Sequence, residues 1–193
     1  QPAMVAKVLG RLRTELGQRL KLADPEQIAM CWVVDFPLLE WNDEDHRYQA
    51  PHNPFSSPKD ADYALLDSRP QDALAKQYDM VWNGTEIGGG SVRIHEREPL
   101  QQVFRAVGLS DEQIEEQFGH MLDAFDYGAP PHGGIAFGID RLVALFAAED
   151  NIREVIAFPK NQTGIDPMMG APSSAEAPQL SDLHIAVVPP PAT

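Results

Sequence analysis

The sequence predicts an α+β fold in which helices flank an antiparallel β-sheet. Three observations support this fold class: an Asn83-Gly84 dipeptide lies between two strand-forming runs, a glycine-bearing strand follows at residues 133–138, and apolar residues recur at helical spacing after Ser110. Helices are mixed with strands that are mostly joined by hairpins, which is typical of an antiparallel sheet. A length of 193 residues suffices for one domain with a sizeable core.

The first elements expected are a helix and a strand. Apolar residues recur at helical spacing with basic residues between them: Val5, Val8, Leu9, Leu12, Leu16 and Leu20. Asp24-Pro25 ends this helix. Residues 28–36 form a nearly continuous apolar run, which is typical of a buried strand. Cys31 lies in this run and is expected to be a small buried hydrophobe, and a single cysteine excludes an internal disulfide framework.

In the rest of the chain, the sequence predicts a long loop followed by a hairpin, two helices and further strands. Residues 40–62 are polar and contain three prolines, so we expect a long loop, and loops of this length are often functional. Residues 78–95 predict a hairpin, and Ser110 with Gln113 predicts the capping box of a helix. Two further elements are expected after the glycine-bearing strand: a helix over about residues 140–148 and a short strand near residues 185–188.

Charge and hydropathy exclude some classes of function. The net charge is −14, whereas a general nucleic-acid-binding surface is basic. RNA stays open as a partner, because a segment elsewhere could carry the basic contacts. No run approaches the roughly 18 apolar residues of a membrane span, and no signal segment opens the chain. Together with the single cysteine, these features predict a cytoplasmic protein without a membrane partner.

The Asn83-Gly84 turn brings two carboxylates together. This dipeptide favours a type I′ turn, because that turn needs positive φ at both central residues. With these two residues as the loop, Asp79 lies opposite Gly88. Asp79 and Glu86 then share one face as diagonal neighbours about 7 Å apart at Cα. Such a pair suits an oxygen-binding cation such as Mg²⁺; the alternative is two solvated carboxylates on the outer face of an ordinary hairpin.

Three consecutive glycines, Gly88–Gly90, follow in the same strand. Glycines inside a strand usually mark a bulge or the close approach of another group. Beyond them, Arg93 offers a planar donor fork that suits a carboxylate. In a regular strand Arg93 points away from Glu86, so the two serve one pocket only if a bulge lies within the glycines. His95 fits a structural histidine at the end of the strand.

Residues 131–142 contain the most specific pattern in the chain, in which small residues alternate along a strand that ends at Asp140 and Arg141. Small residues occupy alternate positions, so one face of this strand is nearly bare backbone: Gly134, Ala136 and Gly138. A flat aromatic ring such as adenine fits against that face. Asp140 is favourable at the positive end of the helix that follows, and Arg141 can stack on a ring or fork to a phosphate. The alternative is a strand packed tightly against a helix, with Arg141 in a surface ion pair.

These segments together resemble a known family. Residues 131–142 are similar to motif 3 of the class II aminoacyl-tRNA synthetases, and residues 83–95 closely resemble the corresponding stretch of the bacterial aspartyl-tRNA synthetases. Four shorter segments resemble the same enzymes: residues 32–37, 151–153, 157–160 and 170–173. The resemblance covers roughly residues 28–188. It implies the C-terminal part of a class II catalytic domain over residues 28–193 and the helical tail of an insertion domain over residues 1–27.

The resemblance implies a role for each candidate site residue. Arg141 binds ATP, and Glu86, helped by Asp79, holds Mg²⁺ and thereby the ATP phosphates. Arg93 forks to the side-chain carboxylate of L-aspartate, which selects the acid over its amide. The further contacts implied are His52 with aspartate, and Gly138, Ile139 and Asp140 with ATP.

The implied activity is that of an aspartate–tRNA ligase, which activates L-aspartate with ATP and transfers it to tRNA(Asp) as a homodimer. Whether tRNA(Asn) is a second acceptor depends on anticodon contacts outside these residues. The family often has a second histidine where this chain has Asn53, and a threonine where it has Ser56. This difference bears on the aspartate contacts.

Motif 1, the motif 2 arginine that grips the α-phosphate and the anticodon-binding barrel do not occur in these residues. We therefore expect the 193-residue chain alone to give no aspartate-dependent ATP–pyrophosphate exchange. Two alternatives stay open: a non-catalytic module that senses an amino acid or a nucleotide, and an asparaginyl-tRNA synthetase.

Overall fold

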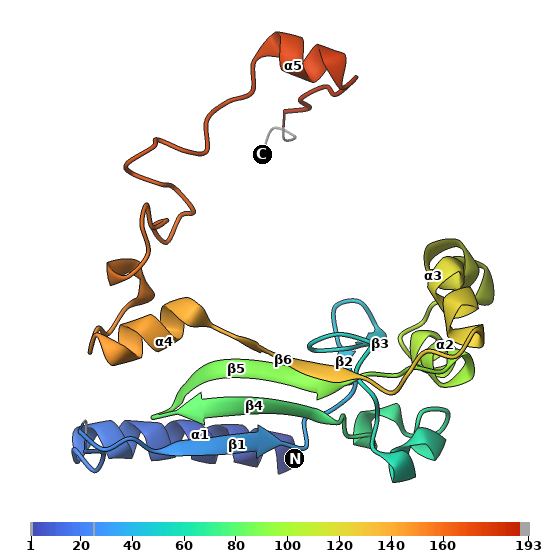
Figure 1. Ribbon diagram of the computed structural model, residues 1–193, viewed down its shortest axis with the longest axis horizontal. Helices are drawn as coiled ribbons and strands as arrows, with labels where there is room; N and C mark the ends of the chain where they lie inside the picture. Colours follow the sequence, from blue (N-terminus) through green and yellow to red (C-terminus); the bar gives the residue numbers. More distant parts are fainter. Residues whose placement is uncertain (1, 25, 190–193) are drawn as a thin grey trace. The chain divides into compact units, whose positions relative to one another are not determined.

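The computed structural model describes residues 2–24 and 26–189 and divides the chain into two compact units (Figure 1). The first unit comprises residues 1–138 and the second residues 139–193. The expected boundary between an insertion tail and a catalytic part, after residue 27, stays a prediction. Each unit is described separately below.

A four-stranded antiparallel sheet forms the body of the first unit. Its strands follow the order β1-β4-β5-β6 (Figure 1), with bounds Met30–Val34 for β1, Gln77–Trp82 for β4, Thr85–Val92 for β5 and Gly133–Phe137 for β6. The antiparallel sheet predicted from the sequence is confirmed. The pairing of β5 with β6 brings the two glycine-bearing strands side by side.

The Asn83-Gly84 turn joins β4 to β5 as predicted. Asn83 has φ 47° and Gly84 has φ 82°, the positive values that a type I′ turn requires. The Asn83 side chain also binds the segment before β1: its Nδ2 donates to Gln27 O at 2.9 Å, and its Oδ1 accepts from Ala29 N at 2.8 Å. The turn residue therefore holds the approach to β1 against the tip of the hairpin.

The register of the hairpin differs from the prediction by one residue. Glu86 pairs with Val81, but Asp79 pairs with Gly89 rather than with Gly88, the partner expected from the sequence. Ile87 is therefore an extra residue, and the bulge lies just before the glycines instead of within them. The physical reason is the apolar Ile87 side chain, which is only 3% exposed and is buried by this irregularity.

Two helices, α2 (Arg97–Ala106) and α3 (Asp111–Asp126), contribute to the hydrophobic core together with residues from the loops and from the segment after β5. The capping box of α3 is confirmed, with Gln113 N donating to Ser110 Oγ at 3.3 Å and Ser110 N donating to Gln113 Oε1 at 2.9 Å. Helix α2 was not predicted from the sequence. The fully buried residues of the two helices are Leu100, Val103, Phe104, Ile114 and Leu122.

The first strand is exposed, contrary to the expectation of a buried strand. Every residue of β1 is exposed, including Cys31. The reason is that the side chains of β1 point alternately to the two faces of the sheet, and both faces are uncovered at this strand within the described part of the unit. An apolar run indicates side chains that favour burial, but burial also requires a neighbouring element, and no described element of this unit packs over β1.

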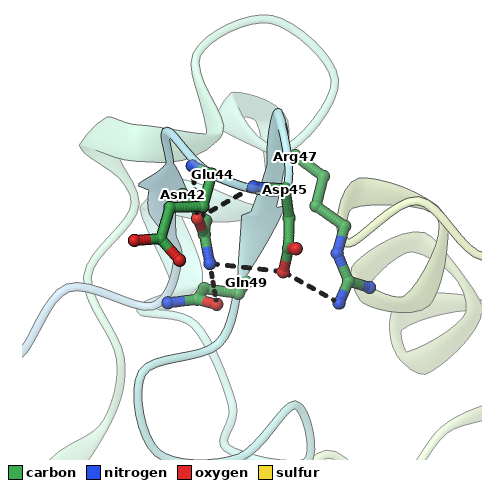
Figure 2. A network of polar contacts seen from close by, with 5 residues as sticks. All are labelled: Asn42, Glu44, Asp45, Arg47 and Gln49. Atoms are coloured by element: carbon green, nitrogen blue, oxygen red, sulfur yellow. Dashed lines mark hydrogen bonds and ion pairs between the residues drawn. The ribbon is translucent and has the colours of Figure 1, made fainter. Parts of the chain in front are cut away.

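The expected loop at residues 40–62 contains a small hairpin. Strands β2 (Glu40–Asn42) and β3 (Arg47–Gln49) pair there, and Asn42 closes the turn between them (Figure 2). Its Oδ1 accepts from Glu44 N at 2.8 Å and from Asp45 N at 3.1 Å, and its Nδ2 donates to Gln49 Oε1 at 2.9 Å. Two short 3₁₀ helices complete this region: η1 (Asp60–Leu65) and η2 (Pro70–Asp72).

The remaining helices are α1 (Pro2–Arg19) in the first unit, and α4 (Ile139–Phe146), η3 (Ile152–Glu154) and α5 (Ala177–Asp182) in the second. Helices α1 and α4 confirm predicted elements. The prediction of a strand near residues 185–188 is wrong, because these residues pair with no strand among the described residues. None of the described helices is long and apolar enough to cross a membrane.

Gly90 permits the close approach of β6, and we expect its replacement to destabilise the fold. A methyl group at Gly90 lies 1.8 Å from the Gly134 carbonyl oxygen, so the Gly90→Ala variant must separate β5 from β6. We expect a loss of about 3 kcal/mol in the free energy of unfolding, measured by urea denaturation. Gly134→Ala is the matched control, because nothing lies within 4 Å of its added methyl group. Equal stability of the two variants contradicts this account.

Candidate functional site

One face of the sheet gathers the candidate residues of β4, β5 and β6. Asp79 pairs with Gly89, and Gly89 pairs with Ala136 on its other side. Directly paired residues point to the same side of a sheet, and so do alternate residues along a strand. The set that shares this side is named here the small-residue face: Asp79, Glu86, Gly89, Ser91, Gly134 and Ala136.

The two carboxylates converge above Gly89. A methyl group at Gly89 lies 2.6 Å from Asp79 Oδ1 and 3.4 Å from Glu86 Oε1, so both side chains lean over the same glycine. The pKa of Asp79 is raised, mainly by burial and next by the charge of Glu86. A raised pKa of this origin indicates that the negative charge lacks full compensation. The sequence prediction that Asp79 and Glu86 form a pair is therefore supported by their geometry.

This pair fits a magnesium ion better than a fully protein-enclosed metal. No group of three or more His, Cys, Asp or Glu side chains forms a metal cluster within residues 2–24 and 26–189. Mg²⁺ commonly takes one or two carboxylates from the protein and the rest of its ligands from water and phosphate. Two converging carboxylates beside an open strand surface match that pattern.

His52 lies in the loop between β1 and β4, near enough to Asp79 for its charge to act on that carboxylate. Its positive charge lowers the pKa of Asp79, against the two larger effects that raise it. The His52 ring is exposed and packs edge-on against Phe36, with ring centroids 5.3 Å apart. The loop singled out by its length thus does reach the small-residue face.

Arg93 belongs to the same face because of the bulge at Ile87. The extra residue brings Gly89, Ser91 and Arg93 into phase with Glu86, whereas a regular strand would point Arg93 to the other side. The Arg93 side chain is half-buried, and its Nη1 donates to Asn53 Oδ1 at 2.6 Å. Sequence reasoning placed Arg93 but missed Asn53 as its partner.

The residues expected to contact ATP occupy the end of β6 and the start of α4. Gly138 N donates to Ile87 O at 2.9 Å, which extends the β5–β6 pairing by one residue. In the second unit, Ile139, Asp140 and Arg141 open α4 and are exposed. Asp140 lies in the first turn of α4, where a negative charge is favourable.

Comparisons with known proteins identify relatives over most of the chain. The family model described as tRNA synthetases class II (D, K and N) matches residues 9–162. The aspartate–tRNA(Asp/Asn) ligase of Heliobacterium modesticaldum is 52% identical over 96% of this chain and 31% of its own length. The aspartate–tRNA ligase of Amoebophilus asiaticus is 54% identical over 92% of this chain and 30% of its own length.

A solved structure shares the fold. The aspartyl-tRNA synthetase from Entamoeba histolytica superposes with a TM-score of 0.53, at 24% identity, over 79% of this chain and 26% of that chain. The chain therefore spans about a third of the length of the curated relatives and about a quarter of this structure.

We expect the pKa of Asp79 to move in opposite directions in two variants. Glu86→Gln removes a like charge and lowers this pKa, whereas His52→Gln removes a positive charge and raises it further. NMR titration of the Asp79 carboxyl carbon measures both shifts. Shifts of the same sign in the two variants contradict the arrangement.

Proposed function

We propose an activity for this chain from one premise: it belongs to the class II tRNA synthetases of the D, K and N group. Residues 28–193 supply the C-terminal part of the catalytic domain of an aspartate–tRNA ligase, and residues 1–27 supply the helical tail of an insertion domain. The observation that supports the proposal is the small-residue face, on which a carboxylate pair and the half-buried Arg93 lie together with small side chains.

L-Aspartate is bound by its side chain through Arg93. The guanidinium is planar and donates two parallel hydrogen bonds to a carboxylate, whereas the amide of asparagine can accept only through its oxygen. His52 adds a polar contact from the loop, close to Asp79. This pocket favours aspartate over asparagine, which argues against an asparaginyl-tRNA synthetase.

ATP binding is assigned to the segment that resembles motif 3. Gly138, Ile139 and Asp140 line the nucleotide, and Arg141 binds it as the arginine of motif 3. Glu86 and Asp79 hold Mg²⁺, which neutralises charge on the ATP phosphates when it is bound. The small side chains at Gly134 and Ala136 leave the strand surface open.

In the complete enzyme, the α-carboxylate of aspartate attacks the α-phosphate of ATP, giving aspartyl-adenylate and pyrophosphate. The aspartyl group then passes to a hydroxyl of the terminal ribose of tRNA(Asp), and AMP leaves. Such chemistry depends mainly on positioning and charge stabilisation, which these side chains supply. The name of the Heliobacterium relative includes tRNA(Asn), which makes this tRNA a second candidate acceptor. We further propose that the complete enzyme is a homodimer and acts in the cytoplasm.

We expect Arg93→Gln to weaken the binding of aspartate strongly in a full-length ligase that contains this chain. Loss of the carboxylate fork raises the KM for aspartate by about 100-fold or more, because a hydrogen bond to a charged group is lost in a desolvated site. Aspartate-dependent ATP–pyrophosphate exchange measures it. Arg105→Gln is the control, since Arg105 pairs with Glu98 and Asp111 on the surface, and it should change the KM less than 2-fold. Equal effects refute the role of Arg93.

We expect Glu86→Gln to weaken the use of Mg²⁺ by the same ligase. The variant removes one of two metal carboxylates, so the Mg²⁺ concentration for half-maximal exchange rises by about 10-fold while the KM for aspartate changes little. Titrating Mg²⁺ at fixed ATP measures the shift. Glu112→Gln on α3 serves as the control for loss of an acidic side chain. An unchanged Mg²⁺ requirement in Glu86→Gln excludes this carboxylate as a ligand.

A further inference from the structure

Asn53 stands out because three donors meet on its side-chain oxygen. Oδ1 accepts from Arg93 Nη1 at 2.6 Å and from Phe55 N at 3.1 Å. The Ser56 hydroxyl lies 3.3 Å from the same oxygen and 2.9 Å from Ser91 Oγ, and its single proton is shared between them. Asn53 thus connects the loop, strand β5 and the arginine at one atom.

The loop that carries Asn53 is fixed to the protein on both sides. Ile94 N donates to Phe55 O at 3.0 Å and Ser57 N donates to Val92 O at 2.8 Å, so the loop backbone pairs with the end of β5. The Phe55 ring contacts the core, with its centroid 5.9 Å from that of Phe104 on α2. Asn53 is therefore a rigid acceptor at a defined place beside Arg93.

The partner of Arg93 differs in charge from those of two nearby arginines. Arg97 pairs with the carboxylates of Asp123 and Asp126, and Arg105 pairs with those of Glu98 and Asp111. Across the residues that the structure describes, Arg93 forms no ion pair, and its side chain is held by a neutral amide oxygen. Its positive charge stays available for a ligand.

We propose that Asn53 is a positioning and specificity-determining residue: its amide oxygen aims the Arg93 guanidinium at the ligand carboxylate without neutralising it. This role rests on the proposed binding of aspartate by Arg93. A carboxylate at position 53 accepts the same three hydrogen bonds and keeps the loop closed, but it pairs with Arg93 and competes with the ligand. An alanine leaves the charge of Arg93 intact but removes the acceptor that the loop needs.

The comparison of Asn53→Asp with Asn53→Ala tests this role in a full-length ligase that contains this chain. We expect Asn53→Asp to raise the KM for aspartate by about 30-fold or more, and Asn53→Ala by about 5-fold, with the KM for ATP unchanged in both. A merely structural role gives the opposite order, because only alanine breaks the turn. The melting temperature of Asn53→Asp should stay within about 2 °C of the wild type.

Asn161→Asp is the matched control. Asn161 Oδ1 also accepts three hydrogen bonds, from Thr163 N, Thr163 Oγ1 and Ile165 N, but no arginine is among the donors. Its KM for aspartate should stay at the wild-type value. An unchanged KM in Asn53→Asp, or a larger effect of Asn53→Ala, overturns the role of Asn53. A wild-type ligase that does not use aspartate overturns the proposed function instead, and the role of Asn53 with it.

Discussion

The extra residue at Ile87 is the constraint on which the candidate site depends. Alternate residues of a strand share a face, so one inserted residue inverts the side on which every later residue lies. Glu86 precedes the insertion and Arg93 follows it, and only the insertion brings both to the same face. On its other side β5 pairs with β6, where Gly89 lies opposite Ala136 and Ser91 opposite Gly134, so the surface between the acidic pair and the arginine carries small side chains.

The electrostatics of this face follow from the same arrangement. Burial and the nearby Glu86 raise the pKa of Asp79, and His52 offsets only part of that effect. A divalent cation would relieve the repulsion between the two carboxylates, because it adds positive charge where both converge. Arg93 is held by the neutral oxygen of Asn53, so it keeps its charge for an anionic group. The face therefore offers one place for a cation and another for a carboxylate.

Local signals predicted the parts of the fold that local interactions determine. The Asn83-Gly84 turn and the Ser110 capping box were predicted correctly, because in each a few adjacent residues satisfy their own backbone geometry. The predictions that failed concern long-range contacts. The apolar run containing Cys31 was expected to be buried, but its burial depends on what covers an edge strand. The bulge was expected within Gly88–Gly90, but the packing of the Ile87 side chain places it one residue earlier.

The sequence by itself singled out the residues of the candidate site: the acidic pair, the arginine after the glycines and the alternating small residues of β6. Residue types and their spacing are enough to identify these three features, because alternate residues of a strand lie on the same face. The tertiary structure alone decided that these features share one face, because the bulge at Ile87 shifts the pairing of β4 with β5, and β6 pairs with β5 so that Ala136 lies opposite Gly89. It also decided that Asn53 holds Arg93, since a contact across 40 residues depends on how the loop packs on the core.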